Sequence, residues 1–241
     1  MFPIRDVNPT LTTPLVTLAI IALNVAVFFL WQPQGTGPEA TEFVYERAAI
    51  ACELTTGDPL TLGEIETDTC TDDGAGHFTG KNVWLAALVS MFLHGGIGHL
   101  LGNMWFLWIF GNNVEEAFGT IGYVAMYLLT GLIATVGFVI FNQDSTIPLV
   151  GASGAIAGIL GAYLVLYPTH RVMSWLLLFF VPVPAVIFLG IWFLSQFLIP
   201  VEGVAWQAHA AGFAAGALLA LPLRPVLLGR VKRAHARAFA R

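Results

Sequence analysis

The sequence predicts an all-α membrane protein, a bundle of six transmembrane helices with a large extracytoplasmic first loop. Of its 241 residues, 57% are hydrophobic and only 10% are charged, whereas about 25% of the residues of a soluble domain are charged. The hydrophobic residues fall into six blocks, most of which approach or exceed the ~20 residues that span a bilayer as a helix. The basic residues also collect on one side of the resulting topology, as is typical of membrane proteins.

Each block is expected to form a helix, because a segment in lipid must satisfy its backbone hydrogen bonds within itself. The six blocks cover residues 14–31, 96–112, 120–141, 149–167, 172–193 and 204–223. The first block is interpreted as a spanning helix and not as a cleaved signal peptide, since residues 31–34 offer no small-residue cleavage site. Together the blocks define a membrane domain over residues 14–223, between a leader (1–13) and a basic tail (224–241).

The positively charged residues indicate the orientation of this domain. With a cytoplasmic N-terminus, eight basic residues lie inside and only Arg47 and Lys81 lie outside. The eight are Arg5, Arg171, Arg224, Arg230, Lys232, Arg233, Arg237 and Arg241. Because cytoplasmic segments are enriched in basic residues, we expect a multi-pass protein of a prokaryotic plasma membrane with both termini cytoplasmic. The tail is suited to anionic lipid headgroups, and no nucleic-acid partner is expected.

The first loop, residues 32–95, is long and acidic. Ten acidic and two basic residues lie between positions 32 and 83, which is typical of a solvated anionic surface, and no metal-ligand spacing is evident there. Both cysteines of the chain, Cys52 and Cys70, lie in this loop. Disulfides form in oxidising compartments, so we expect a Cys52–Cys70 bridge, with two unpaired thiols as the alternative. Residues 82–93 are apolar but too short to span, and are expected at the outer interface.

Strongly polar side chains inside a membrane are costly and usually functional. Four of them stand out in the second, fourth and sixth blocks: His99, Asn103, Ser153 and His209. These three blocks all run from outside to inside and carry their polar residues near the start, so the four residues are expected at similar depth. Three lesser polar residues are interpreted as packing or interface groups: Asn24, Ser195 and Gln196.

The four residues fit nucleophilic catalysis. Ser153 begins a helix, where unpaired backbone amides and the helix dipole favour developing negative charge. A serine hydroxyl needs a base to take its proton, and His209 is the only histidine in the blocks outside the second. No acidic residue is expected at that depth, so the pattern predicts a Ser–His dyad and not a triad. His99 and Asn103, four residues apart on one helix face, are candidate donors to an oxyanion; structural hydrogen bonds between helices are the alternative.

A dyad requires the fourth and sixth blocks to pack closely, and small residues permit this. Glycines at four-residue spacing let helix backbones approach each other in membranes. The glycines assigned to packing are Gly151, Gly154, Gly158, Gly212 and Gly216. His209 and Gly212 are three residues apart and so share one helix face. Ordinary helix packing, with no catalytic role, is the alternative interpretation of the glycines alone.

Three motifs resemble those of the rhomboid family of intramembrane serine proteases. They are His94-x4-His99-x3-Asn103, Gly151-x-Ser153-Gly154 and Ala208-His209-x-x-Gly212-x-x-x-Gly216. In this order they are similar to the family's second-helix, nucleophile and base motifs. Residues 111–115, followed by Gly119, resemble its turn between the second and third helices. The resemblance runs over residues 84–223; any one motif alone would be weak, but their order and spacing together are specific.

The resemblance implies a rhomboid-like six-helix fold and a serine endopeptidase that cleaves single-pass membrane proteins near the outer end of their transmembrane helix. It implies Ser153 and His209 as the dyad, with His99, Asn103 and the backbone amide of Ser153 as the oxyanion hole. Transmembrane protein substrates and membrane lipids are the implied partners, and substrate is expected to enter sideways, past the fifth helix. Neither a cofactor nor a metal is expected.

The sequence departs from some family members near the base. Those members carry a tyrosine four residues after the serine, packed on the catalytic histidine, whereas Ala157 stands at that position here. Phe213 and Trp206 are the alternatives for holding the ring of His209.

Two other functional classes remain as alternatives. A catalytically inactive rhomboid-like protein would bind membrane clients, but such proteins typically lack the serine or the histidine. A polytopic transporter would usually carry carboxylates at mid-depth of its spans. A zinc metalloprotease is disfavoured, because the sequence has no His-Glu-x-x-His motif.

Overall fold

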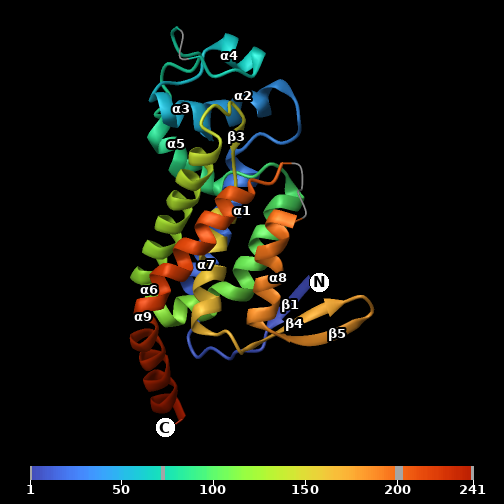
Figure 1. Ribbon diagram of the computed structural model, residues 1–241, viewed down its shortest axis with the longest axis vertical. Helices are drawn as coiled ribbons and strands as arrows, with labels where there is room; N and C mark the ends of the chain where they lie inside the picture. The colour runs from blue at the N-terminus through green and yellow to red at the C-terminus, as the bar shows by residue number, and fades with distance from the viewer. Residues whose placement is uncertain (1, 72–73, 199–202, 240–241) are drawn as a thin grey trace.

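The computed structural model describes residues 2–71, 74–198 and 203–239, and the fold is mostly helical (Figure 1). Two of the ten acidic residues of the first loop, Asp72 and Asp73, and one of the eight basic residues assigned to the inside, Arg241, lie outside the described residues. The α-helices are α1 (Leu15–Ala26), α2 (Pro38–Arg47), α3 (Ala51–Thr56), α4 (Leu62–Thr67), α5 (Val83–Val89), α6 (Ile97–Phe141), α7 (Ser153–Leu166), α8 (Ala185–Leu198) and α9 (Trp206–Phe239). A π-helical segment, η1 (Val27–Trp31), continues α1, and a 3-10 turn, η2 (Ser90–Phe92), continues α5. The strands are β1 (Phe2–Asp6), β2 (Ala49–Ile50), β3 (Pro148–Leu149), β4 (Arg171–Leu176) and β5 (Phe179–Pro184).

The long helices run side by side, and α6, α7 and α9 all pack against one another. Nearly all residues of α7 are buried, as expected for an apolar helix that is surrounded by other helices. The short helices α2 to α5 gather at one end of the bundle, beside the loop that joins α6 to α7 (Figure 1). A three-stranded sheet in the order β1–β4–β5 lies at the opposite end. The first residue of α7, Ser153, therefore lies toward the end that carries the short helices.

The second and third expected helices form one element, α6, with a break at Gly119. Gly119 has φ 72° and ψ 168° within otherwise helical backbone, a conformation that favours glycine. The turn predicted at residues 111–115 is wrong, because these residues are helical. The helix continues past them and brings the buried carboxylate of Glu115 to the start of α1. There the backbone N–H of Thr17 donates to Glu115 Oε2 at 2.8 Å, which supplies a cap that α1 lacks in its own sequence.

The fifth block is only partly helical, and the predicted helix over residues 172–193 begins too early. β4 and β5 pair as an antiparallel hairpin, and α8 begins at Ala185. Pro182 and Pro184 explain the difference, because proline lacks an amide hydrogen and clashes with the preceding turn inside a helix. Proline is tolerated on an edge strand, and β5 is at the edge of its sheet. The described part of α8, Ala185–Leu198, has 14 residues.

Two helices of the described chain, α6 and α9, are long and apolar enough to cross a bilayer by length and composition. Shorter apolar helices occupy Leu15–Trp31, Val83–Phe92, Ser153–Leu166 and Ala185–Leu198. α9 continues beyond the sixth block, through Pro222 and Pro225, so the described part of the predicted tail is helical. Arg230 in this extension donates from Nη1 to the carbonyl oxygen of Phe118 at 3.1 Å. That contact joins the extension to the break in α6.

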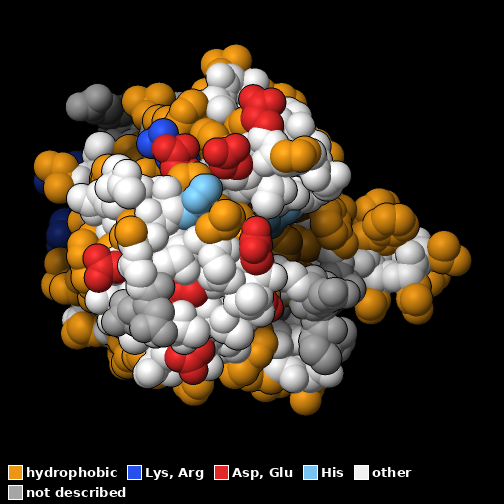
Figure 2. Space-filling model, turned by 90° about the horizontal axis from the view of Figure 1, so that it is seen from above, with side chains coloured by type: hydrophobic (Ala, Val, Ile, Leu, Met, Phe, Trp, Pro, Cys, Tyr) orange, Lys and Arg blue, Asp and Glu red, His pale blue; other side chains and the backbone are white. Residues whose placement is uncertain are grey.

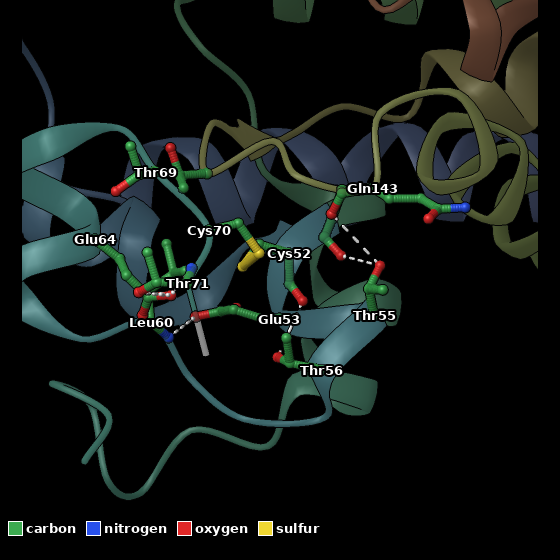
Figure 3. The surroundings of a disulfide bond; sticks show 12 residues. Cys52, Glu53, Thr55, Thr56, Leu60, Glu64, Thr69, Cys70, Thr71 and Gln143 are labelled. Atoms are coloured by element: carbon green, nitrogen blue, oxygen red, sulfur yellow. Dashed lines mark hydrogen bonds between the residues drawn. A yellow bond between two sulfur atoms is a disulfide. The ribbon is translucent and has the colours of Figure 1, made fainter. Parts of the chain in front are cut away.

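The acidic loop folds into a small outer region, made of α2 to α5 and β2. Cys52 and Cys70 are joined in a disulfide, which ties α3 to the segment after α4 (Figure 3). Glu53 and Lys81 form an ion pair at 2.5 Å, and both side chains are only 1% exposed. β2 pairs with β3, so the outer region is hydrogen-bonded to the loop that leads into Ser153.

The surface at this end of the molecule carries many acidic side chains (Figure 2). Exposed acidic residues of the outer region include Glu39, Glu42, Asp58, Glu66 and Asp68. The hairpin at the other end is apolar instead, with Leu177 84% and Leu178 85% exposed at its turn. It projects sideways from the bundle (Figure 1).

Candidate active site

Glycines bring α7 and α9 into backbone contact. A Cβ atom added to Gly212 would overlap the carbonyl group of Gly154, and one added to Gly216 would overlap that of Gly158. Gly154 and Gly158 also face side chains of α6, so a Cβ atom there would collide with α6. Any larger residue at these positions would force the helices apart. The close approach places the first turn of α9 beside the first turn of α7.

Ser153 is the first residue of α7. It follows a turn in which Gly151 has φ 129°, a region of backbone conformation that favours glycine. The turn is held by the backbone N–H of Gly151, which donates to the carbonyl oxygen of Ser90 at 2.9 Å. Ser153 is half-buried, and its side chain lines two cavities. The hydroxyl is therefore accessible at the start of a helix.

His209 lies in the first turn of α9, directly beside this serine. Its Nε2 atom is 2.8 Å from Ser153 Oγ, which is within the reach that a general base needs. The two residues are 56 positions apart in the chain and meet because α7 and α9 are in contact. A serine and a histidine at this distance have the geometry of a nucleophile and its base.

His99 and Asn103 lie near the start of α6, on the same side of the molecule as the dyad. A Cβ atom at Gly151 would come within 2.9 Å of His99 Nε2, so the imidazole packs against the turn before Ser153. Asn103 is buried, and its Nδ2 atom has no hydrogen-bond partner among the described residues. Asn103 lines the same cavity as Ser153 and His209. The structure thus brings all four of these predicted residues to one site.

Two cavities meet at Ser153. The larger has a volume of about 830 Å³ and is lined by α6, α7, α9 and the loop before α7. The second has a volume of about 450 Å³ and lies between α6 and α8. Both are lined by His99, Ser153, Trp206 and His209. The serine can therefore be approached from the outer end of the bundle and from the side between two helices.

Two residues of α8 complete the surroundings of His209, and sequence reasoning missed both. Gln196 Oε1 lies 2.7 Å from His209 Nδ1, although the sequence indicated only a packing role for this glutamine. The ring of Trp192 packs on that of His209, with centroids 6.1 Å apart. The two residues predicted to hold this ring pack on other rings: Phe213 on Trp192, and Trp206 on Phe141 and Phe197. Trp192 and Gln196 are four residues apart and share one helix face, but this spacing alone does not indicate that the face lies against His209.

The described residues contain one cluster of potential metal ligands, and it lies away from the dyad. It consists of Cys52, Cys70 and Glu64. The two sulfur atoms are bonded to each other, so neither is a thiolate, the form in which cysteine binds metals. The cluster is therefore a disulfide site and not a metal centre.

Comparison with known sequences gives one consistent result. The family profile described as Rhomboid domain matches residues 81–226. Rhomboid protease GluP of Bacillus subtilis (strain 168) is 30% identical over 162 residues, which are 66% of this chain and 26% of that protein. RHOMBOID-like protein 6, mitochondrial, of Arabidopsis thaliana is 40% identical over 85 residues, 35% of this chain and 27% of that protein. Rhomboid protein 1, mitochondrial, of Saccharomyces cerevisiae is 26% identical over 194 residues, 79% of this chain and 44% of that protein. The chain thus matches less than half the length of each of these relatives.

Proposed function

Because the chain belongs to the rhomboid family and is therefore an integral membrane protein, we propose that it is an intramembrane serine endopeptidase. Its substrates are single-pass membrane proteins, which it cleaves near the outer end of their transmembrane helix. The observation that carries this proposal is the distance of 2.8 Å between His209 Nε2 and Ser153 Oγ.

The proposed reaction passes through an acyl-enzyme. His209 Nε2 takes the proton of Ser153 while Oγ bonds to the carbonyl carbon of the scissile peptide, whose oxygen becomes an oxyanion. His209 then gives this proton to the leaving nitrogen as the C–N bond breaks. In the second half, His209 takes a proton from a water molecule that attacks the ester, and returns it to Ser153 Oγ as the C–O bond breaks.

The proposed oxyanion hole consists of His99, Asn103 and the backbone amide of Ser153. The first N–H groups of a helix have no partner within the helix, so the Ser153 amide is a suitable donor. Asn103 Nδ2 is buried without a partner among the described residues, and an unsatisfied buried donor costs about 1–3 kcal/mol. A tetrahedral oxyanion would satisfy it. Replacing Asn103 with Ala should lower the cleavage rate by about 10²- to 10³-fold, the usual effect of losing one such donor.

We also propose six membrane spans with the dyad near the outer surface. The spans are α1 with η1, the two parts of α6 on either side of Gly119, α7, α8 and α9. Both termini are then cytoplasmic, and the acidic outer region faces outward. A Glu66→Cys variant should react with a membrane-impermeant maleimide in intact cells, and Lys232→Cys only after lysis. The reverse pattern would overturn the orientation.

The test of the function is the reactivity of Ser153. A fluorophosphonate probe, applied to the purified protein in mild detergent, forms a covalent bond with an activated serine. We expect the parent to be labelled, Ser153→Ala to be unlabelled and His209→Ala to be labelled only in trace. Ser174→Ala, in β4, is the matched control and should react like the parent. If folded parent protein stays unlabelled across a range of pH and detergents, an inactive client-binding protein becomes the better interpretation, ahead of a transporter.

A further inference from the structure

We infer that Gln196 is a positioning residue, which holds His209 in the tautomer that can accept the proton of Ser153. The catalytic consequence of this inference rests on the proposed function, whereas the hydrogen bond is a feature of the structure. Gln196 belongs to α8, His209 to α9 and Ser153 to α7. Three helices thus meet in one chain of hydrogen bonds.

A second hydrogen bond sets the orientation of the Gln196 amide. Its Nε2 atom lies 3.2 Å from the backbone carbonyl oxygen of Trp192, and a carbonyl oxygen can only accept. The NH₂ end of the amide therefore points at Trp192. The Oε1 end then points at His209 Nδ1, at 2.7 Å. Because an amide oxygen cannot donate, Nδ1 must carry the hydrogen of this bond.

The position of that hydrogen decides what the other ring nitrogen can do. A neutral imidazole carries one N–H, so Nε2 is left with its lone pair when Nδ1 is protonated. Nε2 is the atom that lies 2.8 Å from Ser153 Oγ. It therefore accepts the hydrogen bond of the serine hydroxyl, as a general base must. With the hydrogen on Nε2 instead, the histidine would donate to Oγ and could not take its proton.

A glutamine suits this position because the surroundings are largely apolar. In soluble serine proteases a carboxylate orients the histidine, but an ionised carboxylate in an apolar environment is costly unless it is paired. Within the described part of the chain, the hydrogen bonds of the His209 ring go to Gln196 and Ser153. Gln196 supplies an acceptor without adding a charge.

Trp192 constrains the same ring in a different way. It lies one helical turn before Gln196, and its indole packs on the imidazole with 33° between the ring planes. Packing of this kind limits the tilt of the imidazole plane, but it does not distinguish one ring nitrogen from the other. Of the two neighbours, only Gln196 therefore determines which tautomer is present.

The first arm of the test compares Gln196→Leu with Gln196→Glu. Leucine lacks the acceptor, whereas glutamate restores it. We expect the fluorophosphonate labelling rate of Gln196→Leu to fall roughly 10- to 100-fold, as is typical of a misplaced catalytic group, and that of Gln196→Glu to fall less, because the acceptor is kept although a carboxyl group is less favourable there. Gln143→Leu replaces an exposed glutamine in the loop after α6 and should label like the parent. Thermal unfolding in detergent establishes that each variant is folded.

The second arm does not depend on activity. ¹⁵N NMR of protein labelled at histidine distinguishes a ring nitrogen that carries hydrogen from one that does not, and the His209→Ala spectrum assigns the signals. We expect hydrogen on Nδ1 in the parent and a shift toward Nε2 in Gln196→Leu. An unchanged tautomer in Gln196→Leu would overturn the inference, even if the parent is labelled normally. If the parent fails to react with the probe but the tautomer does shift, the proposed function fails and the positioning role of Gln196 stands.

Discussion

α9 contacts its two neighbours in different ways. Toward α7 it presents Gly212 and Gly216, which lie directly against the backbone carbonyl groups of α7. Toward α8 it presents side chains, among them Phe213, whose ring packs on Trp192 with centroids 5.9 Å apart. Gly190 in α8 has no atom within 4 Å of the position that a Cβ atom would take. The α7–α9 contact is therefore made by backbone, and the α8–α9 contact by rings.

The difference shows which parts of the candidate site are fixed and which are adjustable. Backbone atoms in close contact tolerate little displacement, so the α7–α9 contact sets the distance between Ser153 and His209. Side chains have several rotamers, so the α8–α9 contact can adapt more easily. The residues that orient His209, Gln196 and Trp192, both come from α8. Changes in the α7–α9 contact should therefore remove stability and activity together, whereas changes on α8 should lower activity alone.

The largest effect is expected from Gly216→Ala. The added Cβ atom would overlap the carbonyl group of Gly158, so α7 and α9 must separate. Overpacking of this kind typically costs about 1–3 kcal/mol, which corresponds to a decrease in Tm of roughly 2–12 °C for a protein of this size. Because the dyad spans the same two helices, we expect the fluorophosphonate labelling rate to fall by at least about 100-fold. Thermal unfolding and labelling in detergent measure the two effects.

Gly190→Ala is the matched control for this prediction. It makes the same substitution inside a helix, at a position where the new atom meets open space. Alanine has a higher helix propensity than glycine, so Tm should stay the same or rise slightly, and labelling should not change. Equal losses in the two alanine variants would show that the loss in Gly216→Ala does not come from the overlap with Gly158, and that the α7–α9 contact is not rigid.

Trp192→Ala should affect activity more than stability. The substitution removes the ring that packs on His209 but leaves the glycine contact between α7 and α9 intact. Ring pairs of this kind contribute about 0.5–1.5 kcal/mol, so the labelling rate should fall roughly 2- to 10-fold. Trp192→Phe should retain most of the rate, and Trp108→Ala, on an exposed face of α6, should retain all of it. A decrease in Tm as large as that of Gly216→Ala would place α8 in the rigid part of the molecule.

Much of the helical fold could be predicted from the sequence, and the exceptions have physical reasons. Hydropathy identified the apolar blocks, but it does not separate a buried helix from an apolar hairpin. Pro182 and Pro184 were the local signal for the hairpin in the fifth block. The helical course of residues 111–115 had no such local signal. Its consequence, the contact of Glu115 with the start of α1, joins residues that are 98 positions apart in the chain, at Thr17.

The candidate site shows the same limit. Ser153 and His209 could be selected from the sequence because a serine and a histidine in apolar helices are rare and their chemistry is specific. Gln196 could not be assigned to His209, because a glutamine near a helix end has many ordinary uses. Its partner lies on another helix, 13 positions further along the chain, and the distance between them depends on how α8 packs on α9.

The next prediction concerns the sheet that holds the start of α8. β5 leads directly into α8, and β4 pairs with β1, in which Asp6 lies opposite Val172. Burial raises the pKa of the Asp6 carboxyl to about 6, from an ordinary value of 3.8. Between these two pH values the folded protein binds a proton that the unfolded chain has released. The free energy of unfolding should therefore decrease as the pH rises from about 4 to about 6 and remain lower above it.

Asp6→Asn should lack this part of the pH dependence, because asparagine does not ionise. Between pH 8 and pH 5, the Tm of the parent should rise by roughly 2–5 °C relative to that of the variant. Asp58→Asn, which replaces an exposed acid, should follow the parent. The labelling rate at a fixed pH should be the same in all three proteins, since the α7–α9 contact is unchanged. Parallel Tm curves for the parent and Asp6→Asn would show that ionisation of Asp6 does not weaken the sheet.

The outer region belongs to neither contact of α9, and changes in it are expected to have little effect on the dyad. The Cys52–Cys70 disulfide closes a loop with a sequence separation of 18, and a bridge over such a length contributes about 3 kcal/mol in the chain-entropy model. A variant with both cysteines replaced by Ala should therefore be cut faster by added protease in the outer region, while its labelling rate stays close to that of the parent. Added reductant should reproduce this behaviour in the parent and have no effect on the variant.

β2 of the outer region pairs with β3, four residues before Ser153. A fall in labelling as large as that of Trp192→Ala would therefore mean that the position of the serine depends on this pairing as well as on the α7–α9 contact.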